Sequence, residues 1–212
     1  MKITLIYDNT ASRDDLQTDW GFSALVEVEN APTILFDTGA NGEILLSNME
    51  KLGIDPSSID EVFISHAHFD HTGGLSEFLN KSNPTKIYIP PSFRGLKGSG
   101  VTRITEPARL HEGVYSTGEL DGIEQSLCVK TDKGIVIIAG CSHPPMRTIL
   151  DTAGQFGTIY AIIGGLHGFS DFALFRDLEL ICPTHCTQHI AELKQSYPEK
   201  YVAGGAGTVI EI

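Results

Sequence analysis

Apolar positions along the chain fall into short runs that follow either a strand pattern or a helix pattern. Consecutive or alternating apolar residues bounded by turn formers predict strands at 2–7, 22–29, 33–37, 61–65, 86–90, 125–131, 134–139, 159–164, 180–182 and 208–212. Apolar residues at helical spacing predict helices at 41–52, 74–80, 146–156, 172–178 and 190–197. Residues 92–109 follow neither pattern and are predicted to be irregular.

These elements form two successive sets of strands and helices that divide near residue 110. Each set could form a sheet with helices on its outer face. Two such sheets packed face to face would give a four-layer αββα sandwich, although the order alone also allows one mixed α/β sheet. The length of 212 residues and the lack of a low-complexity linker predict a single domain over residues 1–212.

Composition excludes several classes of partner. Acidic residues outnumber basic residues by 27 to 15, for a formal net charge of −12. This balance argues against nucleic acid and against an anionic membrane surface, since both are bound through Lys and Arg, and it leaves room for bound cations. The longest apolar run, 134–141, is far shorter than the ~18 residues of a membrane span. Nothing in the sequence predicts an oligomeric state.

The cysteines point to a reducing environment. Four of them occur without the spacing of a disulfide framework, and the first ten residues predict a strand rather than an export signal. We therefore expect free thiols and a cytoplasmic location. Cys128 and Cys182 are expected in the core, whereas Cys141 and Cys186 each have two alternatives, a metal-binding thiolate or a small buried residue.

Metal-binding side chains gather directly after the predicted strand 61–65, in the sequence HAHFDH at 66–71. In an extended chain His66 and His68 point to the same side, because side-chain direction repeats every two residues. Asp70 and His71 follow in a turn and can face a second point. Imidazole nitrogens bind borderline divalent metals, and a carboxylate adds a charge and a hard oxygen. This spacing favours two neighbouring metal ions over an exposed polar loop.

Three more histidines follow apolar runs among small residues, in GCSH at 140–143, GGLH at 164–167 and PTHC at 183–186. A dinuclear site needs about three protein ligands for each ion, so about two are required beyond the first cluster. We expect His143 and His185 to supply them. His167 could be a ligand, could orient one or could contact substrate. The remaining two, His111 and His189, lie in polar segments and are expected at the surface.

The order of three motifs resembles the metallo-β-lactamase superfamily: GFSALVEVE at 21–29, ILFDTG at 34–39 and SHAHFDHTGGL at 65–75. The resemblance covers nearly the whole chain and implies the αββα sandwich, with metals at the edge where the two sheets meet. EQSLCV at 124–129, GCSHPP at 140–145, GGLHG at 164–168 and PTHCT at 183–187 look like one group within it. That group is the metal-dependent hydrolases related to the dihydropterin-methyl-ribofuranosylaminobenzene phosphate synthase of methanopterin biosynthesis.

The resemblance also implies a ligand set and catalytic residues. One metal would be held by His66, His68 and His143, and the other by Asp70, His71 and His185. Asp70 and His167 are the expected catalytic residues. The expected cofactor is two divalent ions, zinc first, with Mn, Fe and Mg as alternatives.

The chain departs from the wider superfamily at two points. Cys141 stands where many members carry a metal-bridging Asp, and it could bridge the ions instead. Residues 116–119 lack the third His that many members place in a GHT-type turn, so His143 would take that role. These departures weaken the case for ordinary thioester or lactam hydrolysis. HxHxD in place of HxExD, together with the lack of a flavin domain, argues against a diiron oxygen reductase.

Supporting and substrate-binding residues are less sharply marked. Asp37 could hydrogen-bond a ligating His or could cap a turn after its strand. Residues 92–109 are rich in Arg and Lys between glycines, so Arg94 and Lys97 are candidate anion contacts on a mobile lid. The alternative is a solvated loop. Arg147, close to His143, is a further candidate anion contact.

The sequence thus predicts a dinuclear metal-dependent hydrolase that acts on a small anionic substrate, a phosphate or pyrophosphate ester. One alternative is a synthase-like transferase, in which the same metals bind a pyrophosphate leaving group. Another, from a different class, is a metal-dependent binding or sensing protein without turnover. A purely structural metal site is disfavoured, because structural sites are closed and four-coordinate.

Overall fold

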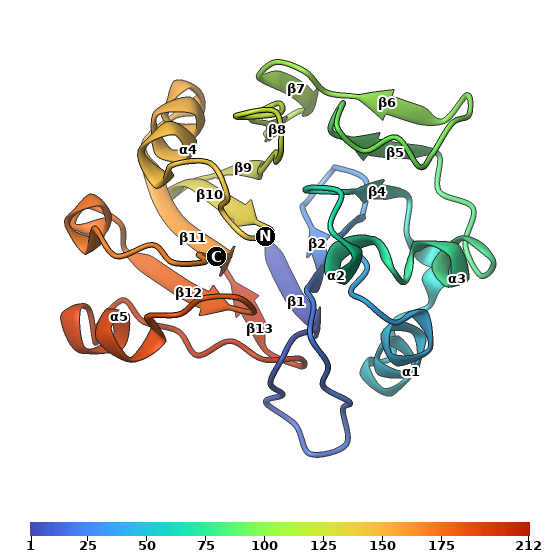
Figure 1. The fold of residues 1–212 in the computed structure, drawn as a ribbon, viewed down its shortest axis with the longest axis horizontal. Helices are drawn as coiled ribbons and strands as arrows, with labels where there is room; N and C mark the ends of the chain where they lie inside the picture. Colours follow the sequence, from blue (N-terminus) through green and yellow to red (C-terminus); the bar gives the residue numbers. More distant parts are fainter.

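Two β-sheets pack face to face between outer helices in the computed structural model, which describes all residues 1–212 (Figure 1). The first sheet has the strand order β13-β1-β2-β3-β4-β5-β6. Its strands are β1 (Lys2–Tyr7), β2 (Ser23–Glu27), β3 (Ile34–Phe36), β4 (Glu61–Phe63), β5 (Lys86–Ile89), β6 (Val101–Arg103) and β13 (Val209–Glu211). Strands β3 to β6 run parallel, whereas β13, β1, β2 and β3 pair antiparallel.

The second sheet has the strand order β12-β11-β10-β9-β8-β7. Its strands are β7 (Ala108–His111), β8 (Val114–Ser116), β9 (Leu127–Thr131), β10 (Gly134–Ala139), β11 (Ile159–Gly165) and β12 (Leu180–Thr184). The last three run parallel, and the others pair antiparallel. The helices are α1 (Gly42–Leu52), α2 (Phe69–Thr72), α3 (Leu75–Leu79), α4 (Met146–Ala153) and α5 (Ile190–Ser196), with 3-10 turns at Pro56–Ser58, Gly154–Phe156 and Phe172–Phe175.

Three buried apolar clusters fill the spaces between these layers. The largest, with 19 residues, lies between the sheets and draws on both, for example Phe36 and Val136. A cluster of 13 residues lies beneath α1 and α3 and includes Phe78. A third, of 12 residues, lies beneath α4 and α5 and includes Ile149. The predicted four-layer αββα arrangement is therefore confirmed (Figure 1).

Strand β10 shows why the central strands read as unbroken apolar runs. Val136 and Ile138 face the other sheet, whereas Ile135 and Ile137 face the helices. All four side chains are fully buried, because this strand is covered on both faces. A strand that is buried on one face only would alternate polar and apolar residues instead.

The sequence prediction was wrong in three places. Strands β6 and β7 begin within residues 92–109, which were predicted to be irregular, and β8 was not predicted at all. These strands are short and lie at the edge of their sheets or next to it, so they carry little apolar pattern. The last strand, β13, returns to pair with β1 in the first sheet, so the chain does not divide cleanly near residue 110. In place of the helix predicted at 172–178, Phe172–Phe175 form a 3-10 turn.

The strand directions bring the carboxyl ends of β1, β3, β4, β10, β11 and β12 to one edge of the sandwich. Contacts across that edge join the sheets: the backbone N–H of His185 donates to Asp8, and a Cβ on Gly140 would collide with the Ser65 side chain. Segments that are far apart in the sequence therefore converge where the motifs end. No helix is both long enough and apolar enough to cross a lipid bilayer.

Core packing on β1 gives a first prediction. Ile3 is fully buried between the sheets, so Ile3→Ala should lower the free energy of unfolding by about 2–5 kcal/mol. Val209 on the neighbouring strand β13 is 49% exposed, so Val209→Ala should change the free energy of unfolding by less than about 0.5 kcal/mol. Urea unfolding of the metal-stripped proteins measures both, and equal losses would contradict this packing.

Candidate metal centre

The HAHFDH motif sits at the end of β4 and folds into two local structures. His66 follows the strand and forms an isolated bridge with Glu124 of the other half. His68 precedes α2, and Asp70 and His71 lie on that short helix rather than in the predicted turn. Because of this helix, His71 is turned inward and is fully buried, whereas Phe69 beside it is 71% exposed.

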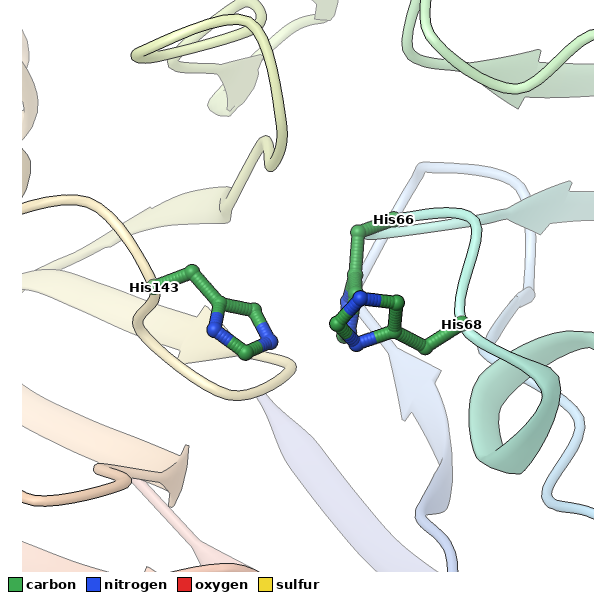
Figure 2. Close-up of side chains that lie close together, drawn as sticks. All are labelled: His66, His68 and His143. Carbon is green, nitrogen blue, oxygen red and sulfur yellow. The ribbon is translucent and has the colours of Figure 1, made fainter.

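The first ligand group contains the imidazoles of His66, His68 and His143. Their ring nitrogens lie within 4.8 Å of one another, and Nε2 of His66 is 3.1 Å from Nδ1 of His68 (Figure 2). His143 approaches from the loop after β10, with its ring centroid 4.9 Å from that of His66 and 4.8 Å from that of His68. Its Nε2 is buried and has no hydrogen-bond partner.

The second ligand group contains Asp70, His71 and His185, again with ligand atoms within 4.8 Å. Oδ2 of Asp70 lies 3.2 Å from Nε2 of His185 and 3.8 Å from Nε2 of His71. Nε2 of His185 is buried and makes no hydrogen bond. The Trp20 indole Nε1 donates to Oδ2 of Asp70 over 2.9 Å, a contact that the sequence did not predict.

Cys141 and His167 border both groups. Sγ of Cys141 lies 3.2 Å from Nε2 of His71, and it also groups with His66. The His167 ring centroid is 5.0 Å from that of His143, and its ligand atom groups with the sulfurs of Cys141 and Cys186. The structure thus brings together the residues predicted to ligate or bridge a metal, and it places Cys186, for which a metal-binding thiolate was one of two alternatives, at the same edge. All four cysteines are free.

Polar partners behind the rings fix which nitrogen faces the cluster. The Asp37 carboxylate accepts from the Ser65 backbone N–H and hydroxyl and lies 2.7 Å from Nδ1 of His71. Since the Ser65 hydroxyl gives its proton to Asp37, it is left to accept from Nδ1 of His66, 2.9 Å away. Oδ1 of Asn9 accepts from Nδ1 of His185 in the same way. These partners leave Nε2 of all three rings directed at the cluster.

Glu124 is the supporting residue for which sequence reasoning assigned no role. Its carboxylate is fully buried and accepts four backbone N–H groups, from Gly140, Cys141, Ser142 and His143. Burial raises the pKa of Glu124, although these donors oppose that effect. The GCSH turn is thus wrapped around one carboxylate. The motif EQSLCV at 124–129 marked this residue in the sequence, but nothing along the chain indicated its backbone partners.

Backbone strain is concentrated around the cluster. Asp37, Ser142, His167 and His185 all have positive φ angles, between 44° and 59°. Such conformations cost of order 1–3 kcal/mol for a side chain other than Gly, and they persist only where surrounding contacts enforce them. Here the enforced conformations turn the side chains of successive strand ends toward one point.

The pKa shifts of three proposed ligands favour the forms that bind metals. His71 differs: burial opposes its protonation, but the Asp37 carboxylate outweighs burial and raises its pKa. Burial and the neighbouring His68 lower the pKa of His143 to about 4, and burial also lowers the pKa of His66. Burial opposes ionisation of Asp70, but the contacts with His185 and His71 outweigh it and lower the pKa of that carboxyl. Neutral imidazoles and an ionised carboxylate are the forms that ligate metals. With the unpartnered Nε2 atoms of His143 and His185, this donor set fits two divalent cations.

The predicted anion-binding residues make no hydrogen bond or ion pair with this cluster. Phe93 and Leu96 pack on the outer core beneath the helices, and Arg94 and Lys97 beside them are exposed and make no hydrogen bond or ion pair. Arg147, on α4, lines a groove of about 520 Å³ between α4 and the 3-10 turns. No histidine of the cluster lines this groove. A substrate role for these three residues stays a prediction.

The wrapped GCSH turn gives a second prediction. In Glu124→Gln the amide must present N–H groups to some of the four backbone donors, so we expect about 2–3 kcal/mol less stability. Because the turn carries His143, the affinity for one metal ion should also fall by roughly 10–100-fold. Urea unfolding and a competition titration with a chromophoric chelator measure these two effects.

Glu61 provides the matched control. It is also a buried carboxylate, hydrogen-bonded to Tyr88 and His111. It begins β4, whereas the cluster follows the other end of that strand. Glu61→Gln should lower stability and leave metal affinity unchanged. If both variants bind metal as the wild type does, Glu124 has no role in positioning His143.

Comparison with known proteins gives matches over most or all of the chain. Residues 21–168 match the metallo-beta-lactamase superfamily. A relative from Methanocaldococcus jannaschii, a 7,8-dihydropterin-6-methyl-4-(beta-D-ribofuranosyl)-aminobenzene-5'-phosphate synthase, is 29% identical, with 98% of this chain and 95% of the relative aligned. The crystal structure of Tm1679, a metal-dependent hydrolase of the beta-lactamase superfamily, superposes with a TM-score of 0.81 at 25% identity, covering 100% of this chain and 99% of that one.

A more distant structure, a diphosphatase of the PhnP family, shares the fold with a TM-score of 0.66 at 13% identity, over 100% of this chain and 97% of that one. The sandwich, the strand-end histidines and the match over residues 21–168 agree with one another. The chain belongs to the metallo-beta-lactamase superfamily.

Proposed function

We propose that the protein is a dinuclear metal-dependent hydrolase that acts on a small phosphate or pyrophosphate ester. The observation that carries the proposal is the pair of three-residue ligand groups that lie side by side at one edge of the sandwich. In this proposal His66, His68 and His143 hold one ion, and Asp70, His71 and His185 hold the other. A pair of divalent ions bound there would polarise the ester oxygens and lower the pKa of the attacking water.

Zinc is the expected metal, with Mn, Fe and Mg as alternatives. Five imidazoles make up most of the donor set, and imidazole suits borderline metals such as zinc and iron. Sγ of Cys141, 3.2 Å from His71, lies where it could bridge the ions in place of a carboxylate, and a thiolate would favour zinc further. Magnesium prefers oxygen ligands, which only Asp70 supplies in this group.

The two proposed catalytic side chains have different surroundings. Asp70 is held by the Trp20 indole and lies among the ligands, so its carboxylate can accept the proton of the attacking water. His167 is exposed at the open side of the cluster, with its ring 5.0 Å from that of His143. From there its imidazole can donate a proton to the leaving oxygen of the ester.

A synthase-like transferase is the second candidate, supported by the 29% identity to the methanococcal synthase over almost the full length of both chains. The same ligand groups would then bind the pyrophosphate of a substrate while a second substrate attacks. Binding or sensing without turnover is the alternative outside catalysis. Arg94, Lys97 and Arg147 remain the proposed anion contacts in either enzyme.

The ligand assignment predicts separate losses of metal. His66→Ala and His71→Ala should each lower the metal content by about one equivalent, because each variant removes a ligand from a different group. His189→Ala is the control, since His189 is paired with Glu192 on α5 and lies outside both groups. Elemental analysis of the purified proteins measures the content. Full metal content in both cluster variants would refute the assignment.

The reaction is tested by a substrate panel. The metal-loaded protein should hydrolyse phosphomonoesters, phosphodiesters or pyrophosphate esters in preference to thioesters and lactams, and a chelator should abolish turnover until metal is restored. In His167→Ala we expect kcat to fall by about 10²–10⁴-fold with both metals retained.

A better leaving group is the internal control for His167. The loss of kcat in His167→Ala should be smaller for a nitrophenyl ester, because nitrophenolate leaves without being protonated. Two bound metals with no turnover of any ester would support the binding-protein alternative instead, and turnover of lactams or thioesters alone would contradict the proposed substrate class.

A further inference from the structure

Trp20 is the feature of the edge that metal ligation alone does not use. Large apolar side chains are exposed at three positions in the whole chain, Trp20 at 57%, Phe69 at 71% and Val209 at 49%. Two of the three border Asp70, one through a hydrogen bond and one as its neighbour in α2. Exposed aromatic side chains beside a cluster of ligands call for an explanation, because burying them elsewhere would stabilise the fold.

The indole of Trp20 is held in place although most of its surface faces solvent. Its Nε1 donates to Oδ2 of Asp70, and its ring centroid lies 5.0 Å from that of His185 at a tilt of 58°. The one polar atom of the ring is thus already hydrogen-bonded to a residue of the ligand group. What remains exposed is an apolar face with no polar group to satisfy.

The backbone around Trp20 is fitted closely to α2. Gly21 has φ of 148°, and a Cβ at this position would lie 2.6 Å from the carbonyl oxygen of Asp70. The next residue, Phe22, donates its backbone N–H to that same oxygen, and the Gly21 N–H donates to Asn9, which orients His185. Any residue other than Gly at position 21 would push the loop, and the indole with it, away from the ligands.

We propose that Trp20 is an aromatic stacking platform that selects, among phosphate or phosphonate compounds, those that carry an aromatic or heteroaromatic ring. This deepens the proposed function and rests on it for the anion-binding metals. A phosphate or phosphonate head group bound to metal at the ligand group of His185 and Asp70 would place its organic substituent against the indole face. A flat ring there would stack on the indole, whereas an alkyl group would not. The exposed apolar surface amounts to two side chains, which is too little for a stable protein interface.

Two non-hydrolysable ligands with the same head group test the platform, namely phenylphosphonate and methylphosphonate. Binding to the zinc-loaded protein is measured by calorimetry, so turnover is not required. Phenylphosphonate should bind roughly 5- to 100-fold more tightly. Because Trp20 is the only Trp in the chain, intrinsic emission reports on it directly, and phenylphosphonate should quench that emission more than methylphosphonate does at equal occupancy.

Two substitutions separate stacking from the hydrogen bond to Asp70. Trp20→Phe removes the Nε1 donor but keeps a ring, so it should retain much of the preference for phenylphosphonate. Trp20→Ala removes both and should abolish the preference. Because both variants lose the donor to Asp70, any change in metal content or in the affinity for methylphosphonate should be the same in Trp20→Ala as in Trp20→Phe. Phe69→Ala, which removes a more exposed aromatic ring without a bond to the Asp70 carboxylate, is the control and should keep the preference.

The platform is overturned if Trp20→Ala keeps the preference, if Trp20→Phe loses it as fully as Trp20→Ala does, or if neither phosphonate binds. Failure of the proposed function looks different. A protein that prefers phenylphosphonate yet hydrolyses no ester retains the aromatic site and is not a hydrolase. A protein that hydrolyses phosphate esters and binds both phosphonates equally is a hydrolase without the platform.

Discussion

The arrangement of the candidate metal centre depends on the buried carboxylate of Asp37. This side chain is completely inaccessible to water, and a buried charge is tolerated only where hydrogen bonds replace its hydration. Three contacts do so: the Ser65 backbone N–H, the Ser65 hydroxyl and Nδ1 of His71. Through them one carboxylate joins the ends of β3 and β4, directs Nε2 of His71 and, by way of Ser65, directs Nε2 of His66.

At the second sheet, Glu124 is a buried carboxylate with a similar role. There a second buried carboxylate collects the N–H groups of the turn after β10 and so fixes His143 and Cys141. Each sheet thus presents its ligands through a backbone tied to an acid, and the two halves meet face to face across the edge (Figure 2). Strained φ angles at Asp37 and Ser142 can persist because these hydrogen bonds hold them in place, and contacts with Asp8 and Asn9 do the same for His185.

The edge combines buried and exposed side chains. Most of the proposed ligands are buried or half-buried, whereas His68, His167, Trp20 and Phe69 are exposed. The loop that carries Trp20 comes from β1, the strand nearest the centre of the first sheet's antiparallel part, and Gly21 lets it lie against α2. A relative with the same ligands could therefore act on a different substrate by changing this loop alone, since loops tolerate change better than strand ends do.

The sequence by itself determined the local chemistry and much of the architecture. Apolar runs such as that of β10 predicted the buried strands, because burial on both faces leaves no alternation, and HAHFDH predicted a metal cluster, because six adjacent residues need no tertiary information to lie together. Only the tertiary structure decided what depends on pairing between distant segments. The return of β13 to β1, the four N–H groups on Glu124, the Asp8 and Asn9 contacts to His185 and the indole on Asp70 join residues that are 16 to 209 positions apart. No periodicity along the chain records such partners.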